Sequence, residues 1–591
     1  MNIFSVVRTI LLKIIHDEFS HTTKLSKINL DPITVELPRE SDHGDMATNA
    51  AMILARPFSL KPHIIAEKIV DRLVQCPQIS SAEIAGPGFI NLRIETSVWY
   101  SVLENVLQLG QSFGSTDLGK QQAVNIEYVS ANPTGPLHVG HARGAVFGDV
   151  LANLLSKVGY VVTKEYYVND AGSQVGSLAR ALHYRYLQVL GLKSEADFQE
   201  AVSASQIEYG GKYLLEVAQS LVDLDGQKWA DVKEEHWLEP LKEFAIKEII
   251  GLIRDDLEAL GVSMDIFTSE KDLVESGLVD TAISSLESKG LVFTGCLEAP
   301  KGQRSDKWEP RPQLLFKSTQ FGDDVDRPLQ KSDGSWTYFA SDIAYHHVKL
   351  ERGFSSMINI WGADHAGYVK RMQASVQALS DSSASLDVKL CQLVHLFDNG
   401  EPVKMSKRTG SYVTLQELIE AVGRDVVRFF MLTRKNDAQL EFDFAKVTEK
   451  SRENPVFYVQ YAHARIHSVL RNAAEFLSEE ALSRVSLIKA DFSLCSDESE
   501  LALIKSLGAW PRVIESAAIK HEPHRLAFYL YELSSEFHAL WNRGNDNSEL
   551  RFLVKGNDQL CTARIALITS VSDVIAEGLD IFGVEPVIEM R

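Results

Sequence analysis

Residues 125–149 read NIEYVSANPTGPLHVGHARGAVFGD, and this stretch decides the fold expected for the whole chain. It opens with β-forming residues, breaks at a cluster of Asn, Pro and Gly, and continues with the apolar spacing of a helix. A strand, a tight turn and a helix are therefore predicted, with His138 and His141 at the start of the helix. A helix N-terminus carries free N–H groups and a partial positive charge, so phosphate is the expected ligand.

The two histidines have a specific use at such a site. Their i,i+3 spacing lets both imidazoles share one face of the first turn. Gly140 between them allows a ligand close to the backbone. Imidazole donors there would stabilise charge on a phosphate under attack. The alternative is a capped helix that carries two surface histidines.

A second motif, VKMSKRTG, occupies residues 403–410. It places Lys404, Lys407 and Arg408 among small or flexible residues, as expected of a loop. Lysines on such a loop are point charges suited to a polyphosphate. The alternative is a solvated basic loop.

In this order and separation, the two motifs resemble the HIGH and KMSKS signatures of class I aminoacyl-tRNA synthetases. The surrounding segments narrow the resemblance to bacterial-type arginyl-tRNA synthetases. The resemblance runs nearly end to end and is densest at 44–50, 125–177, 334–371 and 402–411. It implies ATP-dependent activation of L-arginine to arginyl-adenylate and transfer to the 3′ end of tRNA(Arg), with Mg²⁺ accompanying the nucleotide. It also implies that activation needs bound tRNA, and that the enzyme is a monomer.

Composition sets limits on these expectations. A chain of 591 residues is long enough for about four domains. Its net charge of −20 is unlike that of a general nucleic-acid binder, so any positive surface for tRNA must be local. The five cysteines are scattered, which predicts neither disulfides nor a protein-held metal and fits a reducing cytoplasm. No stretch reaches the roughly 18 uninterrupted apolar residues of a membrane span, so no membrane association is expected.

The order of elements predicts an α/β catalytic domain with a split doubly wound, Rossmann-like parallel sheet. An α+β domain precedes it and an all-α bundle follows. Within the second half we expect strands at 336–339, 357–361 and 388–396, with a helix from about Asp342. The expected domains are 1–115 (contacting tRNA), 121–410 (catalytic, with a mainly helical insertion at about 180–330, including helices at 234–247 and 252–260), 411–453 (connecting) and 454–591 (anticodon-binding).

An arginine site needs carboxylates, because the guanidinium group is a planar cation that stays protonated. Glu127, Asp342 and Asp364 lie near predicted strand ends, and Tyr338 lies one helical turn before Asp342. Helix caps or surface ion pairs are the alternative for each acid. The resemblance assigns the guanidinium to the Tyr338–Asp342 pair, and Asp364-His365 stand where the family often has Gln. The expected arginine-binding residues are Glu127, Ser130, Asn132, His141, Tyr338, Asp342, Asp364 and His365.

The remaining site residues follow from the two motifs and the last domain. His138, His141, Lys404 and Lys407 are the expected catalytic residues. Aromatic and basic side chains of the last domain are candidates for gripping unpaired bases, although core packing explains each one singly. The expected ATP-binding residues are Pro133, Thr134, Gly135, His138, Gly140, His141, Lys404, Met405, Ser406 and Lys407. The expected tRNA-binding residues are Tyr458, Arg465, Trp541 and Arg543.

Three other functions remain open from the sequence. A class I synthetase for glutamate or cysteine would need a basic residue or a thiol–metal site in place of the acids. A nucleotidylyltransferase would share the phosphate motif but leave the terminal domains unexplained. A non-catalytic tRNA-binding paralogue would have no need of intact His138, His141 and Lys407.

Overall fold

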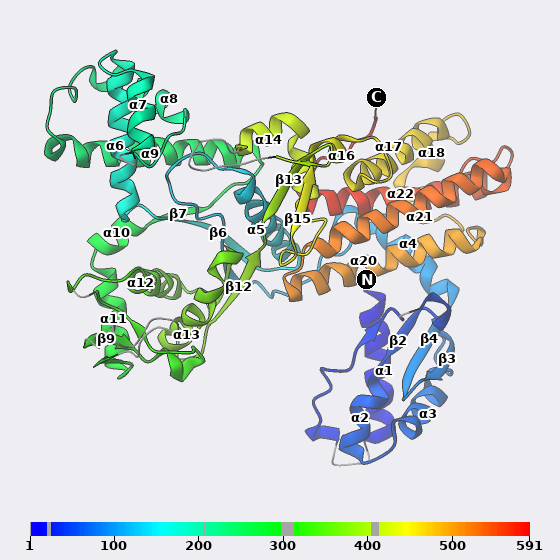
Figure 1. Ribbon diagram of the computed structural model, residues 1–591. Coiled ribbons are helices and arrows are strands. Elements are labelled where there is room, and N and C mark those ends of the chain that lie inside the picture. The colour runs from blue at the N-terminus through cyan, green and yellow to red at the C-terminus, as the bar shows by residue number, and fades with distance from the viewer. Residues whose placement is uncertain are drawn as a thin grey trace. The chain divides into compact units, whose positions relative to one another are not determined.

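The computed structural model describes residues 2–20, 25–38, 40–204, 207–296, 312–331, 333–403 and 413–590 (Figure 1). The chain forms two compact units. One contains Met1–Thr116, Phe457–Ile581 and Glu585–Arg591, and the other contains Asp117–Val456 and Phe582–Val584. The lysine motif residues Lys404, Met405, Ser406 and Lys407 lie outside the described residues.

A five-stranded parallel sheet is the centre of the second unit. Its strand order is β12-β11-β5-β6-β7, so the order reverses beside the first strand, β5. In register, Ile126 of β5 pairs with Lys164 on one side and Ile358 on the other. The predicted class, a split doubly wound sheet between an α+β domain and a helical domain, is confirmed. The strands are β5 (Ala123–Glu127), β6 (Val161–Val168), β7 (Ile266–Ser269), β11 (Ser356–Gly362) and β12 (Ser385–Cys391).

Helix α5 (Val139–Lys157) follows β5 and carries the two motif histidines at its start. Its close approach to the strand depends on Gly148. A Cβ added there would lie 2.3 Å from Cγ of Tyr128, whose ring is fully buried. Gly144, on the same helix, has no heavy atom within 4 Å of an added Cβ.

Gly148→Ala is therefore expected to lower stability by about 1–3 kcal/mol, because a buried ring must move. Gly144→Ala is the matched control and is expected to be neutral or to stabilise by up to about 1 kcal/mol, since alanine favours a helix. Urea unfolding midpoints of the two full-length variants compare them. Equal midpoints would show that α5 does not rest on Tyr128 as described.

The insertion between β6 and β8 is mostly helical, but it contributes β7 to the central sheet. The two helices predicted at 234–247 and 252–260 form one helix, α9, despite Pro240 near its start. Pro240 has no N–H for the His236 carbonyl, so α9 continues through it without that one hydrogen bond. The helices are α6 (Ser173–Val189), α7 (Glu195–Ser203), α8 (Tyr213–Asp225), α9 (Glu234–Ala259), α10 (Glu270–Glu275) and α11 (Leu278–Ser288).

The predicted strand at 336–339 is wrong. Thr337 is the N-cap of helix α12 (Tyr338–Glu351), and its hydroxyl accepts from the Ala340 amide. An isolated bridge between Gln330 and Trp336 is the only strand-like pairing of this stretch within 312–331 and 333–403. A threonine cap outweighed the aromatic and β-branched composition that predicted a strand.

The predicted strand at 388–396 is two strands in different sheets. β12 ends at Cys391, and β13 (Val394–Asp398) pairs with β14 (Glu401–Pro402) and β15 (Leu440–Asp443). Gln392 and Leu393 link β12 to β13. The amide of Gln392 donates to the Asn436 carbonyl, and Leu393 is exposed. Apolar composition continues through this break, so periodicity alone did not mark it.

Smaller elements complete the unit: β8 (Val292–Gly295), β9 (Gln313–Phe316) and β10 (Arg327–Pro328) in an antiparallel sheet, then α13 (Val369–Leu379), α14 (Leu415–Val422), α15 (Arg424–Phe430) and α16 (Phe444–Thr448).

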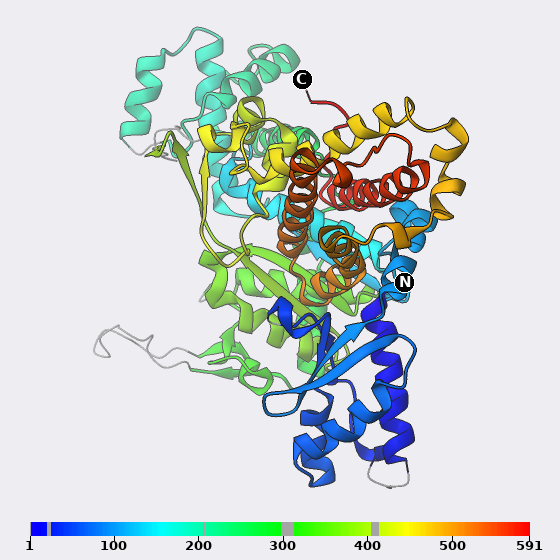
Figure 2. The ribbon, with the colours of Figure 1, turned by 90° about the vertical axis from the view of Figure 1, so that its right-hand side faces the viewer.

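The other unit joins an antiparallel sheet to a bundle of helices (Figure 2). The sheet order is β1-β2-β4-β3, with helices α1 to α3 beside it. In the bundle, α20, α21 and α22 pack against one another, and α21 buries an apolar face at Leu526, Leu530, Leu533 and Phe537. The bounds are α1 (Ile3–Phe19), β1 (Val35–Glu36), β2 (Met46–Thr48), α2 (Ala50–Phe58), α3 (Pro62–Leu73), β3 (Ile79–Ala85), β4 (Phe89–Ile94), α4 (Thr96–Leu109), α17 (Pro455–Ala473), α18 (Glu479–Leu482), α19 (Arg484–Ile488), α20 (Glu498–Lys520), α21 (His524–Asp546) and α22 (Asp558–Ile581).

Among the described residues, α22 is the one helix whose length and composition would allow it to cross a membrane. Its apolar window is 67% buried inside the protein. Contacts with α20 and α21 cover it, as in the core helix of a bundle.

Candidate active site

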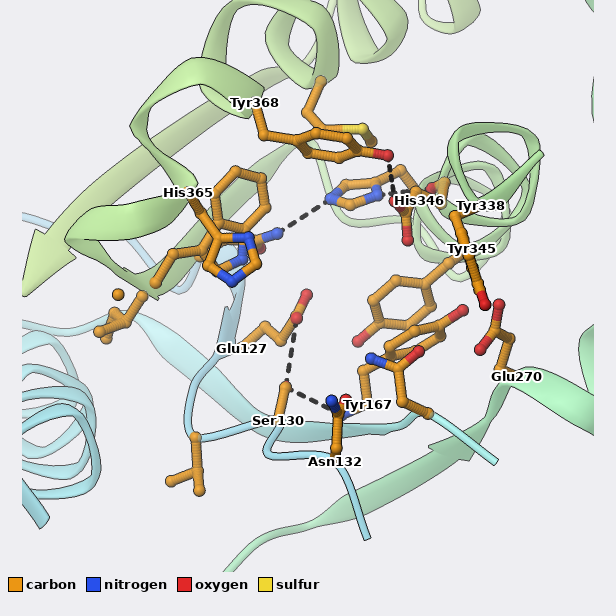
Figure 3. A pocket seen from close by; sticks show the side chains of 18 of the residues that line it. Glu127, Ser130, Asn132, Tyr167, Glu270, Tyr338, Tyr345, His346, His365 and Tyr368 are labelled. Carbon is orange, nitrogen blue, oxygen red and sulfur yellow. Dashed lines mark hydrogen bonds between the residues drawn. The ribbon is translucent and has the colours of Figure 1, made fainter. Parts of the chain in front are cut away.

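A cavity of about 490 Å³ lies at the carboxyl ends of β5, β6 and β11 (Figure 3). This is the edge where open parallel sheets bind ligands, and it includes the point at which the strand order reverses. The central strands, helix α12 and the short helix η6 (Ala363–Tyr368) each contribute side chains. Of the predicted arginine-binding residues, it brings together Glu127, Ser130, Asn132, Tyr338, Asp342 and His365.

The turn after β5 has a strained backbone. Val129 and Ser130 have φ of 69° and 37°, a left-handed conformation that a β-branched residue rarely adopts. The Ser130 hydroxyl donates to Glu127 at 3.2 Å and accepts from the Tyr167 amide at 3.1 Å, which holds the turn in place. Such strain is typical of ligand sites, where a side chain must be aimed.

Three carboxylates reach the cavity, and they differ in their partners. Glu127 is paired with the fully buried Lys349 at 2.8 Å, so its charge is compensated. Asp342 accepts a hydrogen bond from the Tyr368 hydroxyl at 2.5 Å and has no Lys or Arg in ion-pair contact among the described residues. Glu270 is 3% exposed, and within the described chain its Oε2 has no hydrogen-bond partner.

The two acids without a cation have strongly raised pKa values. Burial raises the pKa of Asp342 to about 7, with Glu270 and Glu127 adding repulsion while Tyr368 and Lys349 oppose the rise. Asp342 keeps some exposed surface because it borders the cavity, but protein encloses it on its other sides. Burial, followed by repulsion from Asp170, raises the pKa of Glu270 to about 7. Together these groups make a slot that is ready for a cation.

Aromatic side chains form the wall between these acids. The rings of Tyr167 and Tyr345 lie 4.4 Å apart, and their buried hydroxyls have no hydrogen-bond partner within the described ranges. The ring of His346 lies edge-on to that of Tyr345 at 5.4 Å (Figure 3). Burial lowers its pKa to about 3, so the ring is neutral. Its Nδ1 faces the Asp342 carbonyl at 2.8 Å and must donate, which leaves Nε2 to accept from Asn359.

The predicted Tyr338–Asp342 pair lies one turn apart at the start of α12. The Tyr338 ring is 56% exposed and stands at the mouth of the cavity, while Asp342 lies deeper. Asp364 is not among the lining residues. Its carboxylate is largely exposed and lies 3.5 Å from His365, which does line the cavity.

The two motif histidines lie at the N-terminus of α5 with their rings stacked 3.8 Å apart. His138 is the N-cap, and its Nδ1 accepts from the Gly140 amide at 3.1 Å. The His138 amide in turn donates to Nδ1 of His141 at 3.3 Å. Since both Nδ1 atoms accept, both imidazoles carry their proton on Nε2 and are donors through that atom. Gly140 is needed, because an added Cβ would lie 2.8 Å from the His138 ring.

The insertion holds the turn that precedes these histidines. The carbonyl of Thr134, the residue after Pro133, accepts from the Tyr213 hydroxyl, and the ring of Tyr213 packs over Gly135. The Leu137 amide donates to Asp256 at 2.7 Å. Two helices of the insertion, α8 and α9, therefore hold the turn at which the sequence predicts a phosphate.

The chain that follows the lysine motif returns to this turn. The Val139 amide donates to the Val413 carbonyl, and the Leu415 amide donates to Leu137. His138 and Thr414 form an isolated antiparallel bridge. The two motifs are thus joined by backbone at residues 413–415, just beyond the lysines, which lie outside the described residues.

The predicted tRNA-binding residues lie in the C-terminal helices. The guanidinium of Arg465 lies 4.8 Å from the ring centre of Trp541 and also contacts Tyr461. Tyr458 packs against Tyr531 and His538. Arg543 instead forms an ion pair with Asp497 at 2.7 Å.

Sequence reasoning missed Glu270, Tyr368, His346 and Asn359 in the cavity. Glu270 had a readable signal, because it directly follows the strand IFTS and acids after parallel strands often face a ligand. That strand was hidden within a region predicted to be a helical insertion. Asp170, which follows the carboxyl end of β6, accepts from the Ser269 hydroxyl and from the Lys271 amide at the start of α10.

Comparison with known proteins gives a consistent family. Three family profiles match in succession: "Arginyl tRNA synthetase N terminal domain" over residues 9–94, "tRNA synthetases class I (R), catalytic domain" over 102–466, and "DALR anticodon binding domain" over 459–590. The arginine–tRNA ligase of Rhodospirillum rubrum is 59% identical over 95% of both chains. That of Ruegeria pomeroyi is 54% identical over the full length of both.

Solved structures give the same fold. A putative arginyl-tRNA synthetase from Campylobacter jejuni, 29% identical, matches with a TM-score of 0.70 over 84% of this chain and all of its own. The Thermus thermophilus arginyl-tRNA synthetase, 21% identical, matches with a TM-score of 0.72 over 99% of this chain and all of its own. The chain therefore belongs to the arginyl-tRNA synthetases, a family of class I aminoacyl-tRNA synthetases.

Proposed function

We propose that the cavity beside β5 and β11 binds the L-arginine that this synthetase activates, with Asp342 and Glu270 facing the guanidinium group. The observation that carries the proposal is the pair of enclosed carboxylates in one cavity without a Lys or Arg in ion-pair contact within the described chain. Two such acids favour a ligand that brings its own positive charge. Glu127 contributes polarity, since Lys349 already balances its charge.

The other lining residues suit the remaining parts of the amino acid. Ser130 and Asn132 stand at positions that bind the amino acid in related synthetases, and both lie on the strained turn beside Glu127. Tyr338 at the mouth is placed to cover the bound side chain. His365 occupies the wall where relatives often have Gln, whereas the exposed Asp364 has no part in the proposal.

ATP is proposed to bind with its phosphates at the N-terminus of α5. The partial positive charge at the start of that helix and the Nε2–H donors of His138 and His141 would face the α-phosphate. The turn at Pro133, Thr134 and Gly135 would lie against the nucleotide. Lys407, with Lys404, would neutralise the departing pyrophosphate, and Met405 and Ser406 would lie along the nucleotide.

The first step of the reaction requires the protein mainly to position the reactants and to stabilise the developing charge. The arginine carboxylate is already a nucleophile, so it can attack the α-phosphorus without a catalytic base. One bond forms to the carboxylate oxygen, and the bond to pyrophosphate breaks. Transfer to the 3′-terminal adenosine of tRNA(Arg) follows.

Mg²⁺ is proposed to arrive with the nucleotide phosphates. Among the described residues, the one cluster with metal-ligand spacing is Glu40, Asp42 and His43, which is exposed and lies in the N-terminal sheet domain. The bound ion would reduce the negative charge of the phosphates.

Binding of tRNA is proposed to involve the C-terminal helices. Tyr458, Arg465 and Trp541 form one half-buried aromatic and cationic cluster that suits stacking on unpaired bases. Arg543 would first have to leave Asp497. A cytoplasmic monomer without membrane contact completes the proposal.

ATP–pyrophosphate exchange tests this proposal directly. Exchange is measured with each of the twenty amino acids, with and without tRNA(Arg). We expect exchange with arginine alone among the amino acids, dependent on tRNA. Exchange driven by another amino acid, or none under any condition, would contradict the assignment.

Arginine binding is expected to weaken as the pH falls through 7. Asp342 and Glu270, with pKa values near 7, lose their charge at low pH, so bound arginine must release their protons. The dissociation constant at pH 6 should exceed that at pH 8 by about tenfold for each acid required. Calorimetry in two buffers with different protonation heats measures both the affinity and the protons released.

The same acids affect stability with a defined sign. Because their pKa values are raised in the folded protein, both acids add to the free energy of unfolding of the ligand-free protein at low pH. This added stability is lost as the pH rises from about 4 to 7. The thermal stabilisation by arginine should therefore grow over that range. A pH-independent affinity with no proton release would remove both acids from the binding site.

A further inference from the structure

We propose that Tyr368 is a positioning residue for arginine, because its hydroxyl fixes the Asp342 carboxylate without balancing its charge. The inference rests on the proposed role of Asp342 and extends it to a residue outside the two signature motifs. Its basis is the 2.5 Å hydrogen bond from the Tyr368 hydroxyl to Oδ2 of Asp342 (Figure 3). In the described part of the chain this is the only hydrogen bond of that carboxylate.

The position of the hydroxyl is set by packing of the ring. Tyr368 lies edge-on to Phe339 at 6.1 Å and to Trp361 at 6.0 Å. The guanidinium of Arg371 lies 4.7 Å from the ring centre. These contacts come from α12, β11 and α13, so the tyrosine is held independently of Asp342. The hydroxyl therefore orients the carboxylate, and the carboxylate does not have to orient the hydroxyl.

Asp342 differs from the other buried carboxylates named below because its hydrogen-bond donor, the Tyr368 hydroxyl, carries no charge. Glu127, on the other side of the cavity, is held by Lys349, which supplies both a hydrogen bond and a balancing charge. A lysine at position 368 would likewise hold Asp342 but would compete with the guanidinium of the substrate. A tyrosine hydroxyl has one proton to donate and occupies one carboxylate oxygen. Two other buried carboxylates of this unit also have cation partners: Glu165 on β6 with Arg352, and Asp149 on α5 with Lys164 and Arg428.

The hydroxyl also affects the charge state of Asp342. Burial and the nearby Glu270 and Glu127 favour the protonated acid, while the hydrogen bond from Tyr368 and the charge of Lys349 favour the carboxylate. Tyr167 from β6 also faces this group. Removing the hydroxyl would leave a larger fraction of Asp342 neutral at pH 7. Arginine would then meet a carboxyl that is both less ionised and less well oriented.

Tyr368→Phe tests the inference, because it removes the hydroxyl and leaves the ring packing intact. We expect the KM for arginine at pH 7 to rise by about 10-fold or more, as for a lost charged hydrogen bond, with kcat and the KM for ATP nearly unchanged. The rise should shrink at higher pH, where Asp342 ionises without help. Tyr186→Phe is the matched control, since its hydroxyl bonds the Gly226 carbonyl within the insertion.

Asp342→Asn, alone and combined with Tyr368→Phe, separates this inference from the proposed function. We expect Tyr368→Phe to add little to Asp342→Asn, because the two side chains act as one unit. If Asp342→Asn raises KM and Tyr368→Phe does not, the role of Tyr368 is overturned while the arginine site stands. If neither changes KM, both proposals fail. A fall in kcat at unchanged KM, or full additivity of the two changes, would also overturn the positioning role.

Discussion

Asp342→Asn should raise the KM for arginine by about 10²–10³-fold, the largest binding effect expected of any change in the cavity. The amide keeps the size of the carboxylate and can still accept from Tyr368. It removes the charge that would balance the guanidinium, and it places an amide donor against guanidinium donors. Losing one partner of a desolvated ion pair costs about 3–5 kcal/mol, and the lower part of that range corresponds to this change in affinity.

The measurement is the dependence of tRNA-supported ATP–pyrophosphate exchange on arginine concentration. Asp364→Asn is the matched control, because that carboxylate is exposed beside the cavity and is expected to leave KM unchanged. Glu270→Gln should raise KM by about tenfold, since glutamine leaves the cavity polar but uncharged. An unchanged KM in Asp342→Asn would place the guanidinium elsewhere, and an increase in Asp364→Asn would return that residue to the site.

Only some of the residues that line the pocket could be predicted from the sequence. Tyr338 and Asp342 were predicted from helical spacing and family resemblance, and spacing sufficed because both lie on one helix. Glu270 and Tyr368 come from segments 72 and 26 residues away from Asp342, so no local pattern joins them. Only the sheet order, with β7 beside β6 and η6 after β11, brings the four residues to one cavity.

The fold was predictable to a similar extent. The doubly wound parallel sheet followed from the alternation of strand and helix, which constrains topology strongly, but its edge strand β7 was missed. The errors arose where local chemistry outweighed composition. Thr337 began a helix inside a stretch of β-forming residues, and the chain changed sheets at Gln392 and Leu393 without a loss of apolar character.

His138→Asn should lower kcat for exchange by about 10²–10³-fold while leaving the helix start intact. Asparagine is a favoured N-cap, so its side chain can still accept from the Gly140 amide as Nδ1 of His138 does. It is too short to supply the donor at the position of Nε2. Loss of one preorganised donor to a developing phosphate charge has an effect of this size.

His138→Gln gives the complementary variant. Its amide nitrogen reaches nearly as far as Nε2, but its side chain is a poorer cap. It should therefore retain more kcat than His138→Asn and have a lower unfolding midpoint. Pre-steady-state formation of arginyl-adenylate and urea unfolding measure the two properties separately. If His138→Asn kept full kcat, the histidine would be a helix cap alone, and the charge-stabilising role at this turn would fall to His141 and the lysine motif.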